Sequence, residues 1–217
     1  GIQLMIRSAV YSDLEFIFKC IIESEKSGSN IFPYTAILGI SEFEFKSGLK
    51  QIFEEEIPNQ PWCLDHWIIY ELDGCQAAGL CYWNEQSGMS GSEMLKSQML
   101  SFQFSEQWKS NSINLQKVSN MSIPRKKDYI QLEHLFTHTD FRGKGLMKKL
   151  INWVINSIKS GGVTQNLEIQ LLEDNSTALS LYEYMGFSVE STKCEPEVER
   201  LTLLSSGCKV QMIKQNG

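Results

Sequence analysis

Two glycines separated by one residue lie in the run Phe141–Leu146, between a predicted strand and a predicted helix. The stretch before the run, residues 129–137, is typical of an extended strand, and residues 146–158 carry apolar side chains at helical spacing. Glycines at the start of a helix let backbone N–H groups approach an anion closely, and the helix end adds a partial positive charge. The turn therefore predicts a site for a phosphate-bearing cofactor.

The run differs from two better-known phosphate-binding loops. It lacks the four-residue gap and the terminal Gly-Lys-Ser/Thr of a nucleotide-binding P-loop. It also lacks the third glycine and the downstream acidic residue of a dinucleotide-binding fold. Since a glycine pair by itself also occurs in ordinary tight turns, a second signal is needed to indicate a function.

That second signal is residues 175–187, which are typical of a short helix with both of its ends specified. Asn175 or Ser176 can cap the first turn, and Gly186 can adopt the left-handed conformation that ends the helix. Between the two blocks, residues 167–171 alternate apolar and polar side chains as a strand does.

Taken together, residues 129–190 resemble the GNAT superfamily of N-acetyltransferases. The pyrophosphate loop of that family, Gln/Arg-x-x-Gly-x-Gly/Ala, corresponds here to Arg142-x-x-Gly145-x-Met147, with Met in place of a small residue. The second family block, Asn-x-x-Ala-x-x-Leu-Tyr-x-x-x-Gly-Phe, is matched at Asn175, Ala178, Leu181, Tyr182, Gly186 and Phe187. The resemblance implies a single α/β domain over residues 1–217. Its mixed, mostly antiparallel central sheet would be splayed between strands 4 and 5 and flanked by helices.

The periodicity of the remaining chain agrees with such a fold. Strands are expected at residues 3–8, 66–72, 76–83, 187–189 and 209–213, with an Asp-Gly hairpin turn after residue 72. Helices are expected at residues 12–24 and 41–56, and loops at residues 27–40 and 193–207.

Residues 86–128 form an insertion where the family usually has a short hairpin turn. Gly91–Trp108 is expected to be helical, and residues 111–127 are more polar. The simplest interpretation is a packed surface excursion; the alternatives are an oligomer contact, as in a homodimer, and a partial cover over the acceptor groove. The basic triplet at residues 125–127 is expected to be a solvated turn and is too short to indicate nucleic-acid binding.

The resemblance implies transfer of an acetyl group from acetyl-CoA to a primary amine by direct attack, with coenzyme A as cosubstrate and no metal. Tyr182 would protonate the leaving thiolate, since a tyrosine of pKa about 10 can do so; the ordinary alternative is a buried aromatic on a helix face. The coenzyme would be bound by Leu135, Phe136, Thr137, Arg142, Gly143, Lys144, Gly145, Leu146, Met147 and Asn175.

The general base is less well defined by the sequence. Glu133 is expected in phase with Leu135 and Thr137 on the strand beside the thioester, where it would take a proton directly or through water. An ordinary strand glutamate facing solvent fits the pattern equally well. His134 is expected to point to the opposite face, and His138 is an alternative base.

Composition limits the remaining classes. The net charge of -6 argues against a general nucleic-acid binder and fits a cationic acceptor. No apolar run approaches the roughly 20 residues that span a bilayer, and no signal segment is evident, so we expect a cytoplasmic protein without membrane partners. The six cysteines form no Cys-x-x-Cys pair and are expected to be buried, reduced thiols, and the three histidines are not spaced as a metal site.

The identity of the acceptor stays open at this stage. It is expected to depend on residues 27–40, residues 193–207 and the insertion, and the candidates are a small polyamine, an amino sugar, an amino acid or a peptide N-terminus. An acyl donor larger than acetyl also fits the sequence. The competing hypothesis is a non-catalytic acyl-CoA-binding sensor or regulatory module, which would keep the phosphate loop and need neither Tyr182 nor a base.

Overall fold

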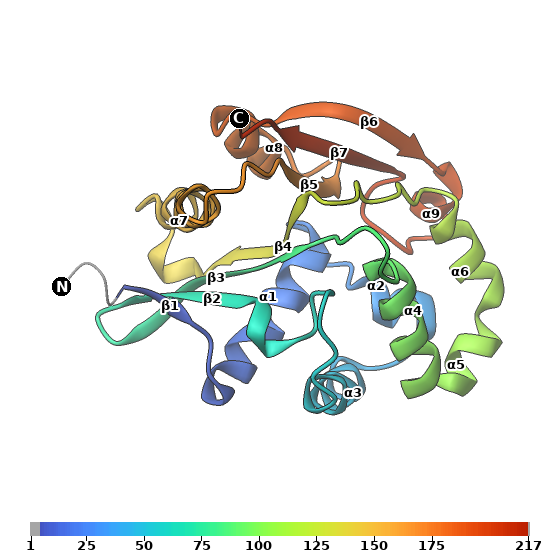
Figure 1. Cartoon of the computed structure of the whole chain (residues 1–217). Coiled ribbons are helices and arrows are strands. Elements are labelled where there is room, and N and C mark those ends of the chain that lie inside the picture. Colours follow the sequence, from blue (N-terminus) through green and yellow to red (C-terminus); the bar gives the residue numbers. More distant parts are fainter. Residues whose placement is uncertain (1–4, 217) are drawn as a thin grey trace.

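The computed structural model describes residues 5–216, which form a seven-stranded mixed sheet with helices on both faces (Figure 1). The order of the strands is β1-β2-β3-β4-β5-β7-β6, and every neighbouring pair is antiparallel except β4–β5. The strands are β1 (Ile6–Ser8), β2 (Trp67–Leu72), β3 (Cys75–Asn84), β4 (Ile130–Thr137), β5 (Leu167–Leu172), β6 (Ser188–Cys194) and β7 (Cys208–Lys214). This arrangement confirms the predicted fold class.

The helices divide between the two faces of the sheet, and each face buries its own core. One core packs against α1 and α3 and includes Ile17, Phe45 and Trp62; the other packs against α7 and α8 and includes Leu150 and Val154. The helices are α1 (Leu14–Lys26), α2 (Pro33–Leu38), α3 (Glu42–Glu54), α4 (Ser92–Gln103), α5 (Ser105–Ser110), α6 (Ser112–Ser119), α7 (Leu146–Ser160), α8 (Ser176–Tyr184) and α9 (Pro196–Arg200). No helix among the described residues is long and apolar enough to cross a membrane.

Local sequence signals explain several element boundaries. Ser41 and Glu44 form a reciprocal capping box at the start of α3, because the Ser41 hydroxyl accepts from the Glu44 N–H at 3.1 Å and the Glu44 carboxylate accepts from the Ser41 N–H at 3.3 Å. Asp73 and Gly74 both have positive φ, as a two-residue hairpin turn requires, and join β2 to β3 as predicted.

The sheet opens between its two parallel strands. Residues Ile130–Leu132 of β4 pair with residues Leu167–Ile169 of β5. The pairing ends there, although β4 continues to Thr137 and β5 to Leu172. Beyond this short register the strands diverge, which is the predicted splay. The backbone edge of β4 that faces β5 is therefore left without a strand partner over residues 133–137.

A buried carboxylate joins the strands below the point where they diverge. Glu168 on β5 is fully buried and accepts four hydrogen bonds, from three side-chain amides and one backbone N–H. The donors are Gln131 at 2.9 Å, Gln170 at 2.8 Å, Gln211 at 2.7 Å and the N–H of Lys126 at 2.8 Å. Because these donors come from β4, β5, β7 and the end of the insertion, Glu168 attaches the insertion to the sheet.

Three segments that the sequence predicted as loops or irregular chain contain short helices. The helix α2 lies within residues 27–40, α6 within residues 111–127 and α9 within residues 193–207. Helices of five to eight residues are too short to show a clear apolar period, which explains why they were missed. The predicted helix at 91–108 is broken into α4 and α5 at Phe104, and β6 extends to Cys194. Of the predicted first strand, residues 3 and 4 lie outside the described residues.

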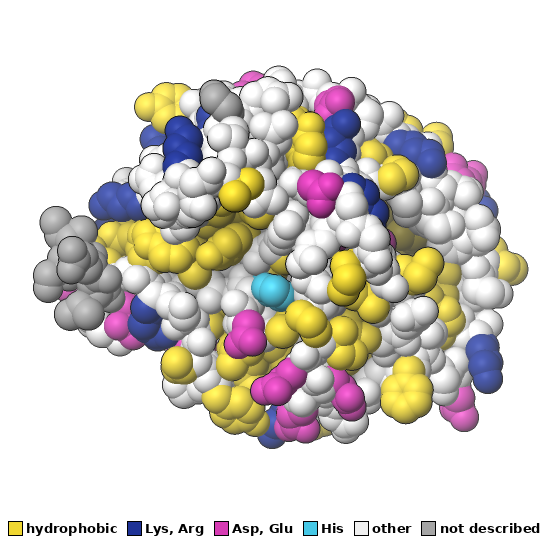
Figure 2. All heavy atoms as spheres, viewed as in Figure 1, with side chains coloured by type: hydrophobic (Ala, Val, Ile, Leu, Met, Phe, Trp, Pro, Cys, Tyr) yellow, Lys and Arg dark blue, Asp and Glu magenta, His cyan; other side chains and the backbone are white. Residues whose placement is uncertain are grey.

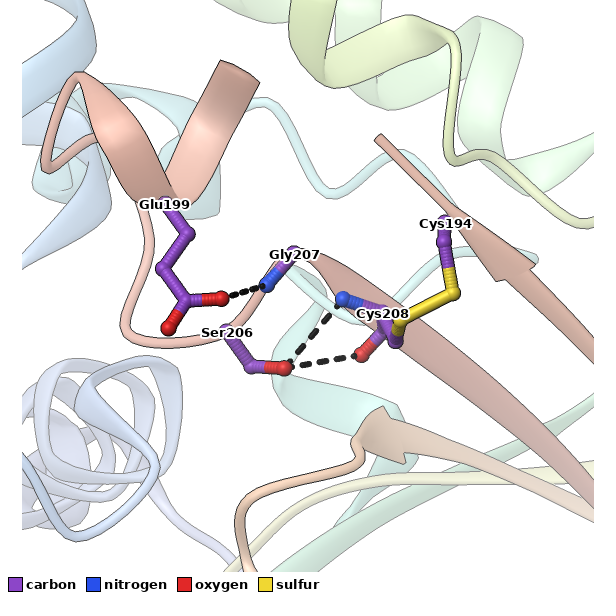
Figure 3. The surroundings of a disulfide bond; sticks show 5 residues. All are labelled: Cys194, Glu199, Ser206, Gly207 and Cys208. Atoms are coloured by element: carbon purple, nitrogen blue, oxygen red, sulfur yellow. Dashed lines mark hydrogen bonds between the residues drawn. A yellow bond between two sulfur atoms is a disulfide. The ribbon is translucent and has the colours of Figure 1, made fainter. Parts of the chain in front are cut away.

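The prediction that all cysteines are reduced is wrong for one pair. Cys194 and Cys208 form a disulfide across the β6–β7 hairpin, where they are directly opposite in the register (Figure 3). They are 14 residues apart, so their contact depends on the hairpin and follows no short motif. Within the enclosed loop, the Gly207 N–H donates to the Glu199 carboxylate at 3.2 Å (Figure 3). The free cysteines are Cys20, Cys63 and Cys81, which are buried, and Cys75, which is exposed.

Replacing Cys194 and Cys208 together by serine should lower the free energy of unfolding by about 3 kcal/mol, because the crosslink limits the unfolded chain over a loop of this size. The measurement is urea denaturation of the oxidised protein and of the double variant. Cys75→Ser, at an exposed free thiol, is the control and should leave stability unchanged. Equal stability of the double variant and the oxidised protein would contradict the prediction.

Candidate active site

A cleft of about 780 Å³ follows the opening of the sheet. It is lined by the turn before α7, by the diverging ends of β4 and β5, and by α4, α6 and the segment from α1 to α2. In Figure 1 these elements run from α7 on one side of the molecule to the insertion helices on the other. Figure 2 shows that this face is hollowed between its upper and lower halves and that hydrophobic side chains border much of the hollow.

The glycine turn takes the conformation that its sequence predicts. Gly143 and Gly145 have φ values of +80° and +71°, and Gly145 is the N-cap of α7. No heavy atom would lie within 4 Å of a Cβ at either position, so space does not require glycine there. The requirement is the left-handed backbone, which glycine adopts without steric cost.

The start of α7 offers a series of free backbone donors. The first hydrogen bond of the helix joins the Lys149 N–H to the Gly145 carbonyl at 3.2 Å. Within residues 5–216, the N–H groups of Gly143 to Lys148 have no hydrogen-bond partner. Free N–H groups at the N-terminus of a helix of this length form an anion site. The roles of Arg142, Lys144 and Leu146 in binding a cofactor stay predictions.

Met147 occupies the position where the resembled family has a small residue. Its side chain is half-buried, packs against the core on the α7 side and also lines the cleft. A phosphate would use the backbone N–H of this residue, so the side chain is compatible with binding as long as it stays against the core.

Next to this turn, the open edge of β4 can bind an extended ligand. Leu135, Phe136 and Thr137 line the cleft, and their strand pairs with β3 but not with β5 at these positions. An unpaired strand edge presents N–H and C=O groups to any ligand that carries amides. This geometry supports the prediction that the coenzyme contacts the main chain of β4. Such contacts do not depend on which side chains the strand carries.

A β-bulge changes which side chains of β4 face the cleft. Gly79 pairs with Phe136 and Cys81 with Glu133, so His134 and Leu135 together oppose a single residue of β3. His134 takes the left-handed conformation, with φ of +56°. As a result Glu133 and His134 both face the α1 side, whereas Leu135 packs toward α7. The expectations that Glu133 is in phase with Leu135 and that His134 points to the opposite face are therefore wrong.

His134 is fully hydrogen-bonded and neutral. Its Nε2 accepts from the indole N–H of Trp62 at 3.3 Å, so the proton is assigned to Nδ1, which donates to the Ser24 hydroxyl at 3.0 Å. The Ser24 hydroxyl in turn donates to the carbonyl of Ile21 at 3.0 Å. Burial lowers the pKa of His134 to about 4. Neither ring nitrogen is free to act as a base.

Glu133 is paired with a buried arginine from the insertion. The Arg125 guanidinium donates to Glu133 at 2.6 Å and to Glu93 at 3.2 Å, and its side chain is only 4% exposed. The expectation that residue 125 belongs to a solvated turn is therefore wrong. Burial would raise the pKa of Glu133, but Arg125 and Lys96 outweigh it and lower that pKa. A carboxylate paired in this way is a weak proton acceptor.

Glu25 is a second carboxylate in the cleft, which the sequence analysis missed. It lies in the last turn of α1, where a glutamate ordinarily faces solvent, and the insertion residues that line the same cleft are distant in sequence. Its carboxylate lies 3.9 Å from Nδ1 of His134, and ligand atoms of Glu25, Glu133 and His134 all lie within 4.8 Å of one another. In the described part of the chain Glu25 has no hydrogen bond, and burial raises its pKa. These properties favour Glu25 over Glu133 as the proton acceptor.

The cluster of Glu25, Glu133 and His134 has the spacing of a metal site, but only Glu25 has a carboxylate without a hydrogen bond or cationic partner among the described residues. Both nitrogens of His134 already form hydrogen bonds, and Glu133 is paired with Arg125. A second group of suitable spacing consists of Glu173 with the two disulfide cysteines, whose sulfurs cannot act as thiolate ligands.

Tyr182 and Asn175 are placed at the cleft by α8. The side-chain oxygen of Asn175 accepts from the Ala178 N–H at 3.3 Å, which makes it the helix N-cap. Tyr182 is buried against Phe187, with 6.2 Å between the ring centroids, and burial raises the pKa of its hydroxyl. The phenol therefore stays protonated and can donate. His138 is not among the residues that line the cleft and accepts from the Asp140 N–H at 3.1 Å.

The insertion forms a wall of the same cleft. Side chains from α4 to α6 and from the chain after α6 reach it: Glu93, Lys96, Leu100, Trp108, Leu115, Val118 and Arg125. The interpretation of residues 86–128 as a packed surface excursion is therefore incomplete, because the insertion closes the end of the cleft opposite the glycine turn.

Comparisons with known proteins agree with this geometry. Residues 40–187 match the acetyltransferase (GNAT) family, and since this is more than half of the chain, the chain belongs to that family. No curated protein matches it.

Solved structures of low sequence identity share the fold. A structure described as an acetyltransferase is 18% identical, with a TM-score of 0.59, and the match covers 98% of this chain and 99% of that one. An N-acetyltransferase from Staphylococcus aureus is 15% identical, with a TM-score of 0.63 and coverage of 96% and 99%. The ribosomal-protein-S18-alanine N-acetyltransferase from Escherichia coli is 14% identical, with a TM-score of 0.50 and coverage of 98% and 93%.

The neutral state of His134 predicts how stability depends on pH. Its pKa is about 4 in the folded protein and about 6.5 in an unfolded chain. Between these values the unfolded state binds a proton that the folded state excludes, so stability falls as pH falls and is unaffected above the upper value. His134→Asn tolerates the left-handed backbone and should lose this component, about 3 kcal/mol at pH 4.

The measurement is urea denaturation of both proteins from pH 7 to pH 4. His138→Asn, at a partly exposed histidine outside the cleft, is the control and should follow the wild-type curve. Parallel curves for wild type and His134→Asn would show that the buried ring is protonated in the folded state.

Proposed function

We propose that this protein is an N-acetyltransferase that moves the acetyl group of acetyl-CoA to a primary amine by direct attack. The observation that carries the proposal is the convergence of three groups on one cleft. These are the free N–H groups before α7, the unpaired edge of β4 and the buried, protonated Tyr182. The N–H groups suit a pyrophosphate, the strand edge suits an amide-bearing arm, and the phenol suits a thiolate that needs a proton.

The residues of the cleft support a reaction without a covalent enzyme intermediate. The acceptor ammonium would lose a proton to Glu25, directly or through water, and the amine nitrogen would attack the thioester carbonyl. As the carbon–sulfur bond breaks, the sulfur takes the electron pair, and the Tyr182 hydroxyl supplies a proton to it. The nitrogen releases its second proton through water as the amide forms, and the Tyr182 phenolate takes a proton back from water. Backbone N–H groups at the open edge of β4 are placed to stabilise the oxyanion.

Glu133 has a different part in this proposal from the one that its sequence position suggested. Held by Arg125 at 2.6 Å, it stays ionised and adds negative charge beside Glu25. That charge attracts the acceptor ammonium, while Glu25, with its raised pKa, accepts the proton.

The alternative of a non-catalytic acyl-CoA-binding module would use the same phosphate site. It would have no need for a phenol at the thiol position or for a carboxylate in the acceptor end of the cleft. Tyr182 and Glu25 both line the cleft and therefore support the enzyme.

Tyr182→Phe should lower kcat about 100-fold or more and leave the Kd for CoA unchanged, because the phenol is needed only when the thiolate forms. The measurements are thiol release from acetyl-CoA with an amine panel and calorimetric titration with CoA. Tyr184→Phe, at an exposed residue of the same helix, is the control. Unchanged turnover in Tyr182→Phe would remove Tyr182 from the mechanism.

Gly145→Glu should abolish CoA binding, because it strains the left-handed N-cap and adds a negative charge at the predicted phosphate site. Gly162→Glu is a matched control, since Gly162 also has a positive φ and open space but lies beyond the other end of α7. CoA titration of both variants gives the answer. Tight CoA binding by Gly145→Glu would overturn the assignment of the loop.

A further inference from the structure

The insertion end of the cleft collects charged side chains of both signs. Carboxylates and cations from α1, α4, β4, β7 and the end of the insertion line it together: Glu25, Glu93, Glu133, Lys96, Arg125 and Lys209. Charges enclosed in a cleft are costly unless they are paired, so the pairs that they form show which charges are left for a ligand.

Most of these charges already have partners. Arg125 binds Glu133 at 2.6 Å and Glu93 at 3.2 Å, and it also stacks over the Trp83 ring at 5.2 Å. Lys96 lies 3.8 Å from Glu93, which it shares with Arg125. This group is held together by its own contacts and forms a fixed wall.

Two opposite charges are left over. Among residues 5–216, Lys209 has neither an ion pair nor a hydrogen bond. In the same range Glu25 has no hydrogen bond and no cationic partner, because the His134 ring 3.9 Å from it is neutral and its other close neighbour is the Glu133 carboxylate. On β7, the side chains of Lys209 and Gln211 lie on the same face of the sheet. The Gln211 amide donates a hydrogen bond to the Pro124 carbonyl of the insertion at 3.3 Å, so the Lys209 side chain also faces the insertion. Burial lowers the pKa of Lys209, with Glu93 acting in the opposite direction. A half-buried cation that lines the cleft without a partner indicates a position for an anion.

We infer that the acceptor is a small zwitterionic amine, whose ammonium group lies at Glu25 and whose carboxylate or phosphate binds Lys209. The inference rests on the proposed function and names the substrate class of the same site. It selects among the acceptors that the sequence leaves open. A polyamine would place a second cation beside Lys209 and Lys96, whereas an amino acid-like molecule matches both unpaired charges.

The experiment uses the protein saturated with CoA and measures ligand binding by calorimetry. The probes are matched pairs of a zwitterion and an analogue without its anionic group: glycine and glycinamide, β-alanine and β-alaninamide, γ-aminobutyrate and butylamine, and O-phosphoethanolamine and ethanolamine. Putrescine is included as the dication. At least one zwitterion should bind about tenfold more tightly than its analogue without the anionic group, as expected for one charge-assisted contact. The carboxylates and the phosphate in the panel show which anion the site takes.

Lys209→Met should remove that tenfold preference and leave binding of the analogue without the anionic group unchanged. Lys193→Met is the matched control, because Lys193 is the exposed register neighbour of Lys209 on β6. Any one of four results would overturn the inference: equal affinity for zwitterions and their analogues without the anionic group, binding of putrescine alone, no binding of any zwitterion, or an unchanged preference in Lys209→Met.

Thiol release from acetyl-CoA, measured on the same panel, separates this inference from the proposed function. If amines without an anionic group turn over as fast as the zwitterions, the proposed acetyltransferase function stands and the inferred zwitterionic acceptor is wrong. Lys209-dependent binding of a zwitterion without thiol release would support the ligand class and contradict the proposed function.

Discussion

The bulge at His134 is the constraint on which the rest of the site depends. A non-glycine residue in the left-handed region costs on the order of 1–3 kcal/mol unless its surroundings hold it there. Here the ring is held from two sides, by the indole of Trp62 and the hydroxyl of Ser24. With this extra residue in β4, Glu133 and His134 face the cleft together, and Glu133 meets Arg125 from the insertion. An unbulged strand would turn one of the two side chains to the other face of the sheet.

The cleft combines two parts that have different origins in the chain. One end is built by the glycine turn, the start of α7 and the open edge of β4. The other end is built by α1 and the insertion, whose return to the sheet is fixed by the hydrogen bonds of Glu168. In the proposed function, the first end binds the acetyl donor, and the second end supplies the charges that meet the acceptor.

Sequence reasoning succeeded where local signals decide the structure. The glycine turn before α7, the capping box at Ser41 and the Asp73–Gly74 hairpin all depend on neighbouring residues, and the two GNAT blocks gave the fold class. It failed where contacts are long-range. A one-residue bulge cannot be read from an alternating pattern, the disulfide depends on hairpin register, and Glu25 lies in a cleft that is also lined by an insertion far along the chain. The roles of Tyr182 and the coenzyme-binding residues stay predictions.

A crystal structure of the protein with CoA tests the central claim most directly. The account predicts the pyrophosphate on the N–H groups of Gly143 to Met147 and the pantetheine arm along the open edge of β4. The sulfur should lie within about 3–4 Å of the Tyr182 hydroxyl, close enough for a proton transfer. CoA bound outside this cleft, or with its sulfur directed away from Tyr182 and the carboxylates, would contradict the account.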